Sequence, residues 1–427
     1  LGGYLGAMSS TRSRRTSENV GTGLIVVATA FSALAVLAFQ AVGSRTLGTD
    51  AFAPIAVLWT VMFLIYTVLH IPAEQHLTRA LVVTRDIGAI GRVRRDMLGA
   101  FALGAVIGVG FVALTLDRFF ESNPAFIVIT AGIMVSRSIM ATARGALAGH
   151  RRFGGYAGSI ALEAGALLIG GLTMAVFGQT AVAFAAVMAL APLATLLARP
   201  FADIEGTAPV PDAHAQPGSF LAWLILATAS SQLIIAGGPI AVGFVGGTAG
   251  AVSIYFTSFA LLRGPVTSAY NLVARVLPDF TTLAHGDDPR SLWRWAPRLA
   301  IAGALLAVLG AIASGLLLQP IISAVYGASF TPPRLAAIFG GAGVGLGLGA
   351  LFTTQIYSAA ARGALLATGW LIALVVSLVV IAFSMLDPID RVALAFLAGE
   401  GTGLVVLGVA IPLLVVRREH RIAGTTT

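Results

Sequence analysis

The sequence is short of charged residues and contains neither cysteine nor lysine. Only 10% of its 427 residues are charged and 57% are hydrophobic, whereas an average soluble domain carries about 25% charged residues. So few charges cannot cover a water-exposed surface, and we therefore expect most of the surface to face lipid. The absence of cysteine excludes disulfide bonds and thiolate metal sites.

The basic residues are all arginine, and they give the chain a formal net charge of +8. A strongly basic chain can indicate a nucleic-acid partner. In a chain as apolar as this one, the charge is better explained by basic loops on the cytoplasmic side of a membrane. We therefore predict that nucleic acid is not a partner.

Long apolar runs fill most of the chain. A helix that spans a bilayer needs about 20 mostly apolar residues. We predict an all-α polytopic membrane protein with about twelve transmembrane helices. The expected helices are residues 20–43, 51–73, 97–117, 125–148, 157–178, 181–198, 219–241, 251–277, 299–318, 334–358, 364–386 and 391–416.

The placement of arginine predicts the orientation, because cytoplasmic loops carry an excess of basic residues. If the N-terminus is inside, 18 of the 26 basic residues lie in cytoplasmic segments, four in external segments and four within helices. The opposite orientation would reverse this bias. We therefore predict that both ends of the chain are cytoplasmic.

A polar, proline-rich stretch divides the chain into two halves, as in the duplicated lobes that are common among transporters. We interpret residues 199–218 as a cytoplasmic linker. The predicted parts are a cytoplasmic tail at 1–19, an N-terminal six-helix lobe at 20–198, the linker at 199–218, a C-terminal six-helix lobe at 219–416 and a cytoplasmic tail at 417–427.

Both lobes repeat one pattern around their second helix. A short external turn, residues 48–50 or 246–248, leads into that helix, and a proline is expected to end it, Pro72 or Pro278. A charged cytoplasmic loop follows in each lobe. The repeated pattern supports the division into two lobes.

Residues for catalysis are scarce. The sequence offers no cluster of His and Glu at metal-binding spacing and no Ser/His/Asp set. Membrane glycosyltransferases that use lipid-linked sugars generally need acidic residues in sizeable external loops, whereas the first external loop here, residues 44–50, has one acid, Asp50. We therefore predict a protein that is not an enzyme and that needs no metal or cofactor.

Charged residues inside apolar helices are costly in hydrocarbon and usually face a cavity or a partner. Arg137 and Arg144 lie seven residues apart, on one face of the fourth helix. Guanidinium groups suit phosphate oxygens, so both are candidate anion-binding residues. For Arg144 the alternative is an ion pair with Glu163 or an extension to the membrane surface. Arg137 lies near mid-membrane without such a route, which favours a functional role.

Arg263 is followed by Gly264 and Pro265 near the middle of the eighth helix. Proline removes a backbone donor and frees a carbonyl one turn back. Transporters build midplane binding sites beside such helix breaks, and the alternative is a proline kink with a buried ion pair. Tyr270 and Asn271, about two turns along the same face, are candidate polar residues of the same cavity.

Glu400 lies within a glycine-rich stretch of the last helix, residues 399–403. Burial disfavours the charged form of a carboxylate, so Glu400 is a candidate for carrying a coupling proton, and Glu163 is a second candidate for ion coupling. The alternative is that Glu400 only neutralises Arg137 or Arg263.

Glycines recur at four-residue intervals in two of the expected helices. They are Gly341, Gly345 and Gly349 in the tenth helix, and Gly104 and Gly108 in the third. Small residues at this spacing indicate close packing between helices.

Three segments resemble motifs of a known family. The segment 44–52 (SRTLGTDAF) is similar to the R-x-LG-x-x-x-[GF] turn after the first helix of polysaccharide flippases. The segment 144–153 (RGALAGHRRF) resembles the RG-x-x-x-G-x-x-[RK]-[FY] end of their fourth helix, and 324–330 (AVYGASF) resembles their LYG-x-x-[FY] segment before the tenth. With its twelve expected helices, nearly the whole chain resembles the Wzx-type lipid-linked oligosaccharide flippases of the multidrug/oligosaccharidyl-lipid/polysaccharide exporter superfamily.

The resemblance implies a role in polysaccharide biosynthesis at the bacterial inner membrane. Two lobes around a central cavity would move a polyprenyl-pyrophosphate-linked glycan from the inner to the outer leaflet by alternating access. Arg137, Arg144 and Arg263 would hold the pyrophosphate while the lipid tail slides between the lobes. The expected partners are the lipid-linked glycan, membrane lipids and a coupling proton or sodium ion, and we expect a monomer.

Two alternatives stay open. A drug or cation antiporter of the same fold usually carries a cation-binding acid in the first helix, and the run 20–43 has none. A non-transporting membrane scaffold, from another class, would lack a solvent-accessible cavity. The lipid II flippases of the superfamily usually have fourteen helices, which is more than this chain can hold.

Overall fold

The computed structural model describes residues 2–83, 87–202, 218–266 and 293–412, together with Ala269, Phe280 and Leu283. These residues form helices and loops without a strand, which confirms the predicted all-α class. The chain divides into two compact units, residues 1–214 and 215–427. The division falls inside the stretch interpreted as a linker, and each unit is described by itself.

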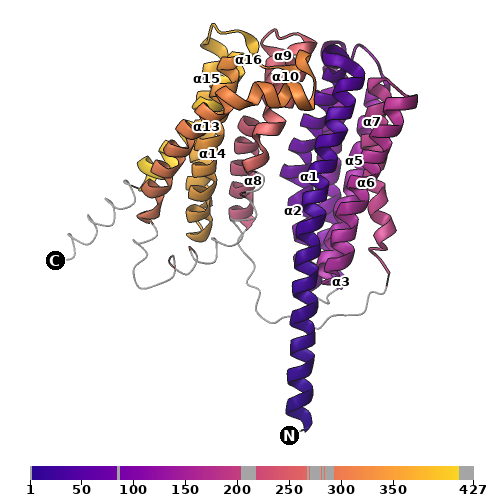
Figure 1. Ribbon diagram of the computed structural model, residues 1–427. Coiled ribbons are helices and arrows are strands. Elements are labelled where there is room, and N and C mark those ends of the chain that lie inside the picture. The colour runs from indigo at the N-terminus through magenta and orange to yellow at the C-terminus, as the bar shows by residue number, and fades with distance from the viewer. Residues whose placement is uncertain are drawn as a thin grey trace, which may run out of the picture. The chain divides into compact units, whose positions relative to one another are not determined.

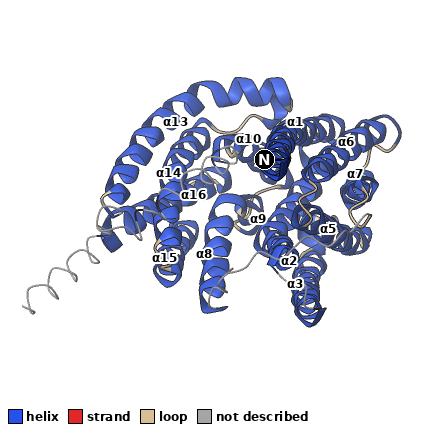
Figure 2. Cartoon of the chain, turned by 90° about the horizontal axis from the view of Figure 1, so that it is seen from below, coloured by secondary structure: helices blue, strands red, loops and turns tan. Residues whose placement is uncertain are grey.

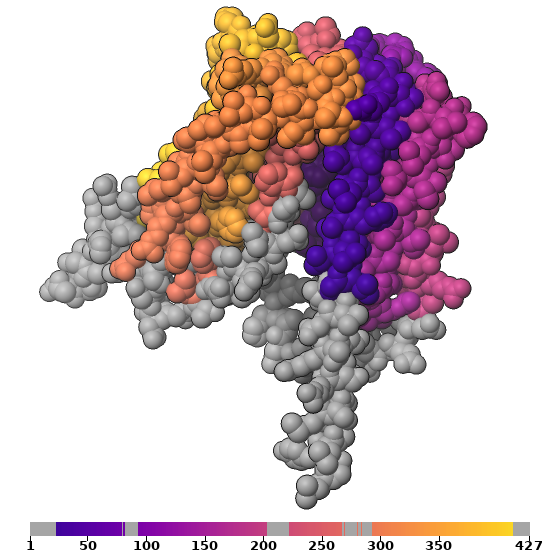
Figure 3. All heavy atoms as spheres, viewed as in Figure 1, coloured from indigo at the N-terminus to yellow at the C-terminus, as the bar shows by residue number. Residues whose placement is uncertain are grey.

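The N-terminal unit contains seven α-helices among its described residues (Figure 1). In chain order they are α1 (Gly2–Ile65), α2 (Ile71–Val83), α3 (Ile87–Leu114), α4 (Leu116–Phe119), α5 (Ala125–Gly149), α6 (Phe153–Phe177) and α7 (Ala181–Leu190), with a π-helical turn at Tyr66–His70 and a 3-10 segment at Ala191–Ala198. Helix α1 packs along α6, and both are visible in the space-filling view (Figure 3).

Helix α1 is broken at Gly48, whose φ of 75° and ψ of 178° are not helical. The apolar helical segment from Gly23 to Thr78 has 56 residues, and at 1.5 Å per residue it would be about 84 Å long. A bilayer core is about 30 Å thick. The segment is therefore two spans that meet at Gly48, where the sequence predicted an external turn.

The C-terminal unit contains the helices α8 (Gly218–Ala236), α9 (Gly238–Phe244), α10 (Ala249–Leu262), α13 (Trp295–Val325), α14 (Arg334–Ala359), α15 (Gly363–Phe383) and α16 (Pro388–Val405). A 3-10 turn at Ala328–Phe330 precedes α14, and a π-helical turn at Val406–Ala410 follows α16. Helix α14 contacts both α13 and α16 and lies between them (Figure 2).

Among the described residues, nine helices are long and apolar enough to cross a membrane, or ten when the bent pair α8 and α9 counts as one span. Dividing α1 at Gly48 adds a further span. Helix α10 coincides with the start of the expected run 251–277, most of whose second half lies outside the described residues. Each of the twelve expected runs therefore contains a helix.

Large apolar side chains cover the outside of these helices. Val106 on α3, Val176 on α6 and Leu309 on α13 are more than half exposed. Such side chains are unfavourable in water when they form continuous surfaces, but they suit contact with lipid tails. The chain is a multi-pass membrane protein.

One expectation about a helix end is wrong, and the other expected end, Pro278, lies outside the described residues. Pro72 does not end a helix, because α2 runs through it to Val83. The π-helical turn immediately before it shifts the hydrogen bonds to the i→i+5 register, and the N–H of Ile71 donates to Tyr66, which accommodates the missing donor of Pro72. The expected helix 219–241 is instead bent by 65° between α8 and α9, at Gly237 and just before Pro239.

The predicted close packing of the glycine repeats is confirmed. A Cβ added to Gly341 or Gly345 would overlap the backbone of Gly310 or Ala307 on α13, and one added to Gly349 would lie 2.8 Å from the Cα of Gly303. The absence of side chains lets the two helices approach until their backbones touch. In the N-terminal unit, a Cβ on Gly104 or Gly108 would lie 2.9 Å from Ile65.

Candidate functional site

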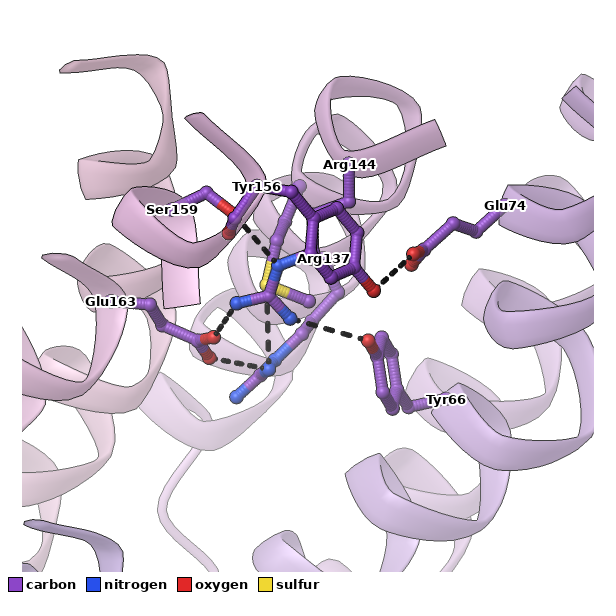
Figure 4. A network of polar contacts seen from close by, with 8 residues as sticks. Tyr66, Glu74, Arg137, Arg144, Tyr156, Ser159 and Glu163 are labelled. Atoms are coloured by element: carbon purple, nitrogen blue, oxygen red, sulfur yellow. Dashed lines mark hydrogen bonds and ion pairs between the residues drawn. The ribbon is translucent and has the colours of Figure 1, made fainter. Parts of the chain in front are cut away.

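A cluster of three charged side chains lies inside the N-terminal unit, between α5 and α6. Nη1 of Arg137 lies 2.6 Å from Oε1 of Glu163, and Nη2 of Arg144 lies 2.7 Å from Oε2 of the same carboxylate (Figure 4). Arg137 and Arg144 are nearly buried. We call these three residues the arginine cluster. The ion pair of Arg144 with Glu163, considered as an alternative from the sequence, is present, and Arg137 shares it.

Each nitrogen of the Arg144 guanidinium has a partner. Besides Glu163, Nε donates to the hydroxyl of Ser159 at 3.3 Å, and Nη1 donates to the hydroxyl of Tyr66 at 3.5 Å. Charge-assisted bonds of this kind are stronger than neutral ones. Arg144 is therefore fixed by three elements: α5 itself, α6 and the π-helical turn.

Arg137 is less completely bonded. Its Nη1 atom also approaches the sulfur of Met140 at 3.7 Å, and its guanidinium carbon lies 5.5 Å from the centre of the Tyr66 ring, a distance typical of a cation–π contact. Its Nε atom is buried and has no hydrogen-bond partner among the described residues. Arg137 therefore retains an unused donor for a ligand oxygen.

Tyr66 was not predicted from the sequence as a site residue. It lies at the start of the π-helical turn Tyr66–His70, and such turns often occur at functional sites. At the other end of the turn, His70 lies 3.3 Å from the hydroxyl of Ser138 on α5. The available signal is Pro72, because its missing N–H favours a change of hydrogen-bond register just before it.

A cavity of about 410 Å³ lies next to the arginine cluster in the N-terminal unit. It is lined by Tyr66, Ile71, Glu74, Gln75, Thr78, Ala148 and Tyr156. We call it the tyrosine pocket. The hydroxyl of Tyr156 donates to Oε1 of Glu74 at 3.0 Å (Figure 4), and Tyr66 belongs both to the pocket wall and to the contacts of Arg144.

The motif that begins at Arg144 explains how α5 and α2 form this pocket. A Cβ added to Gly145 would lie 3.0 Å from the carbonyl oxygen of Glu74, and one added to Gly149 would lie 2.8 Å from the side chain of Leu81. The two glycines therefore let α2 approach α5 closely. This approach brings Glu74 beside the arginine-bearing face of α5.

Glu400 lies in the C-terminal unit and is wholly buried. Neither of its carboxylate oxygens has a hydrogen-bond partner among the described residues. The alternative that Glu400 neutralises Arg137 or Arg263 stays a prediction. Glycine explains how α14 accommodates it, because a Cβ on Gly347 would lie 3.0 Å from Oε2 of Glu400.

Arg263 is the C-terminal cap residue of α10, so the helix is interrupted beside Gly264 and Pro265, where the sequence indicated a break. Its Nε atom donates to the carbonyl of Phe259 at 3.2 Å. Arg137 and Arg263 belong to different units, and a cavity shared by them stays a prediction. Tyr270 and Asn271 lie outside the described residues.

Among the part of the chain that the structure describes, no group of three or more His, Asp or Glu is arranged to hold a metal ion. The chemistry that the N-terminal unit offers is ionic binding and hydrogen bonding, from two guanidinium groups, two carboxylates and two tyrosine hydroxyls.

No family model and no curated protein matches this sequence. Solved structures do match its fold. The inward-facing conformation of a multidrug resistance MATE family transporter of the MOP superfamily has a TM-score of 0.63 at 14% identity, covering 91% of this chain and 96% of the other. The lipid II flippase MurJ in an inward closed conformation has a TM-score of 0.65 at 13% identity, covering 91% and 87%.

A third structure, MATE in a bent conformation, has a TM-score of 0.57 at 11% identity, covering 95% of this chain and 97% of the other. The chain has the polytopic, all-helical fold of the MATE and MurJ transporters.

Proposed function

We propose that this protein is a Wzx-type flippase, which moves a polyprenyl-(pyro)phosphate-linked glycan from the inner to the outer leaflet of the bacterial plasma membrane by alternating access. Three sequence motifs that resemble those of the polysaccharide flippases support this. The fold supports it too, because the chain shares it with a lipid II flippase. The protein acts as a monomer with one lobe in each unit.

The observation that carries the proposal is the unused donor of Arg137. A buried donor without a partner costs about 1–3 kcal/mol, and a phosphate oxygen that accepted from Nε would remove that cost. Arg137 already uses Nη1 on Glu163, so its guanidinium is held in a fixed orientation. A fixed planar guanidinium is suited to phosphate oxygens, which accept from two of its nitrogens at once.

The charge of the arginine cluster points the same way. Two guanidinium groups share one carboxylate, Glu163, so a formal charge of +1 remains on the three side chains. In a medium of low dielectric constant this charge attracts an anion more strongly than it would in water. A (pyro)phosphate that enters the cluster supplies the missing negative charge.

Drug or cation antiport by the same fold is the second candidate, and the resemblance to the MATE structures favours it. An antiporter needs an acid that binds the cation or proton. The part of α1 before Gly48 that is expected to span the membrane has no acid. Of the two candidates for ion coupling, Glu163 already binds two arginines, so Glu400 is the acid that we expect this mechanism to use. The two candidates therefore place the essential charge in different units.

Translocation of a labelled lipid-linked sugar in reconstituted vesicles tests the proposal. Arg137→Gln should lower the rate about tenfold, as expected when one bidentate contact of about 1.4 kcal/mol is lost. Arg334→Gln is the matched control, because Arg334 is exposed at the start of α14. Vesicles that export cationic dyes but leave the lipid-linked sugar in its original leaflet would establish the antiporter instead.

A further inference from the structure

The tyrosine pocket has hydrogen-bonding capacity that the protein itself does not use. Oε2 of Glu74 and the exposed amide of Gln75 make no hydrogen bond to other described residues. The hydroxyl of Tyr66 accepts from Arg144, which leaves its proton available to a ligand. The pocket therefore presents acceptors and donors together, as a ligand with hydroxyl groups requires.

The charges around the pocket disfavour an anion inside it. Glu74 is a wall residue, and its carboxylate would repel a phosphate group at contact distance. The guanidinium groups of Arg137 and Arg144 lie behind the wall, where Glu163 binds both. An anion therefore gains more from Arg137 than from the pocket.

The same surroundings disfavour a cation. Two tyrosines and a carboxylate resemble the aromatic cages that bind ammonium groups. However, the guanidinium carbon of Arg137 already lies 5.5 Å from the centre of the Tyr66 ring. Tyr66 also accepts from Arg144. A second cation beside these two would be repelled. The pocket therefore has a carboxylate in its wall and a positively charged cluster beside it, and neither sign of ligand charge is favoured inside it.

We infer that the tyrosine pocket is a binding site for a neutral sugar unit of the glycan, separate from the phosphate site at Arg137. This rests on the proposed function, since the sugar is the end of the same lipid-linked substrate. The volume of about 410 Å³ lies within the range of ligand pockets. Tyr66 contacts both Arg137 and the pocket, so a sugar joined to a phosphate can occupy both sites at once.

The position of the pocket along α5 agrees with loading from the cytoplasm. Ala148 lines it one residue before the end of the helix at Gly149. In the predicted orientation this end of α5 is cytoplasmic, which is the side from which a newly assembled lipid-linked glycan arrives. Arg137 lies about three turns deeper along the same helix.

Binding of soluble probes tests the pocket without transport. N-acetylglucosamine, methyl α-mannoside and methyl α-galactoside are titrated against purified protein in nanodiscs and followed by saturation-transfer NMR, beside tetraethylammonium and sodium pyrophosphate. At least one sugar should bind in the pocket. Ala148→Phe, which fills the pocket without changing a charge, should abolish that binding, whereas Ala102→Phe on the exposed face of α3 should not.

Two further variants separate the ligand classes. Tyr156→Phe removes the hydroxyl that bonds Glu74 and should weaken sugar binding about fivefold. The matched control is Tyr357→Phe, because the hydroxyl of Tyr357 donates to the backbone carbonyl of Leu407 in the other unit. If tetraethylammonium binds instead and Glu74→Gln abolishes it, the pocket is a cation site and the inference is wrong.

A transport experiment compares the rate at which the protein moves a sugar-bearing polyprenyl diphosphate with the rate for the sugar-free polyprenyl diphosphate. Ala148→Phe should slow the sugar-bearing carrier more than tenfold and leave the sugar-free carrier within about twofold. Equal slowing of both, with no sugar bound by the wild type, overturns the inference but leaves the flippase proposal standing. If the wild type moves neither carrier, the flippase proposal fails, and the sugar titration still decides the ligand of the pocket.

Discussion

Nη1 of Arg137 lies 2.6 Å from Oε1 of Glu163, and the other oxygen of that carboxylate is bound to a second arginine. One carboxylate therefore holds two nearly buried cations. Glu163→Gln keeps the shape but leaves both guanidinium groups without a counter-charge. Breaking a buried pair costs about 3–5 kcal/mol, and we expect a loss of stability of about 3 kcal/mol, measured as a lower unfolding midpoint in detergent.

The double variant Arg137→Gln, Glu163→Gln provides the control for this first prediction. It removes one cation together with the shared anion, so it should be more stable than Glu163→Gln alone. The coupling between the two positions should exceed about 1 kcal/mol, as for residues in one network. Additive effects would show that the ion pair contributes no stability.

The two arginines should differ in what they contribute. Arg144 has partners on all three nitrogens, whereas Arg137 has an unused Nε. Arg144→Gln should therefore lower stability more than Arg137→Gln, by about 1–2 kcal/mol. Arg137→Gln should lower the transport rate more than Arg144→Gln does, although it lowers the stability less. Thermal unfolding and vesicle transport, measured on both variants, check this order, and the reverse order would assign the binding role to Arg144.

The atoms that surround a helical glycine should decide how much stability is lost when it is replaced by alanine. Gly345→Ala would overlap the backbone of Ala307, which cannot move without separating α13 from α14, and we expect a cost of about 3 kcal/mol. Gly347→Ala meets only the end of Glu400 at 3.0 Å, so its cost should be about 1 kcal/mol. Gly110→Ala, with open space around it, should be neutral or slightly stabilising because alanine favours helix.

Much of the fold follows from the sequence because each span must be about 20 apolar residues long and must satisfy its own backbone hydrogen bonds. Gly48 and the small-residue repeat at Gly341, Gly345 and Gly349 gave local signals that matched the structure. The bend at Gly237 was missed because an apolar run of normal length spans it. Mean hydropathy is averaged over about 20 residues, so it stays high across a bend that does not interrupt the apolar run.

The site was harder to predict because its members come from separate helices. Spacing on one helix put Arg137 and Arg144 on one face, and the pair with Glu163 was within reach of sequence reasoning. Tyr66 and Glu74 gave no such signal. Their contribution depends on a π-helical turn and on the close approach of α2 to α5, which are tertiary features.

We expect Glu400 to couple transport to a proton or sodium gradient rather than to bind the glycan. A buried carboxylate without a hydrogen-bond partner is costly when ionised and is more stable when it carries a proton or a bound cation. Glu400→Gln should leave stability unchanged or slightly raised, and it should abolish any acceleration of transport by an imposed proton gradient. A sodium gradient applied separately distinguishes the two ions. A variant that still responds to both gradients would exclude Glu400 from coupling.

Arg263 tests whether the geometry of the guanidinium matters or only its charge. It is the C-terminal cap residue of α10, beside the interruption at Gly264 and Pro265, and transporters often form substrate sites where a membrane helix is interrupted. Lysine keeps the charge but offers a point donor in place of the planar fork, so Arg263→Lys should lower flipping of the lipid-linked glycan about tenfold, the loss of one bidentate contact near 1.4 kcal/mol. Arg334→Lys, at an exposed position of the same unit, should have no effect. Full activity of Arg263→Lys would refute the geometric argument, and full activity of Arg263→Ala would remove Arg263 from the site.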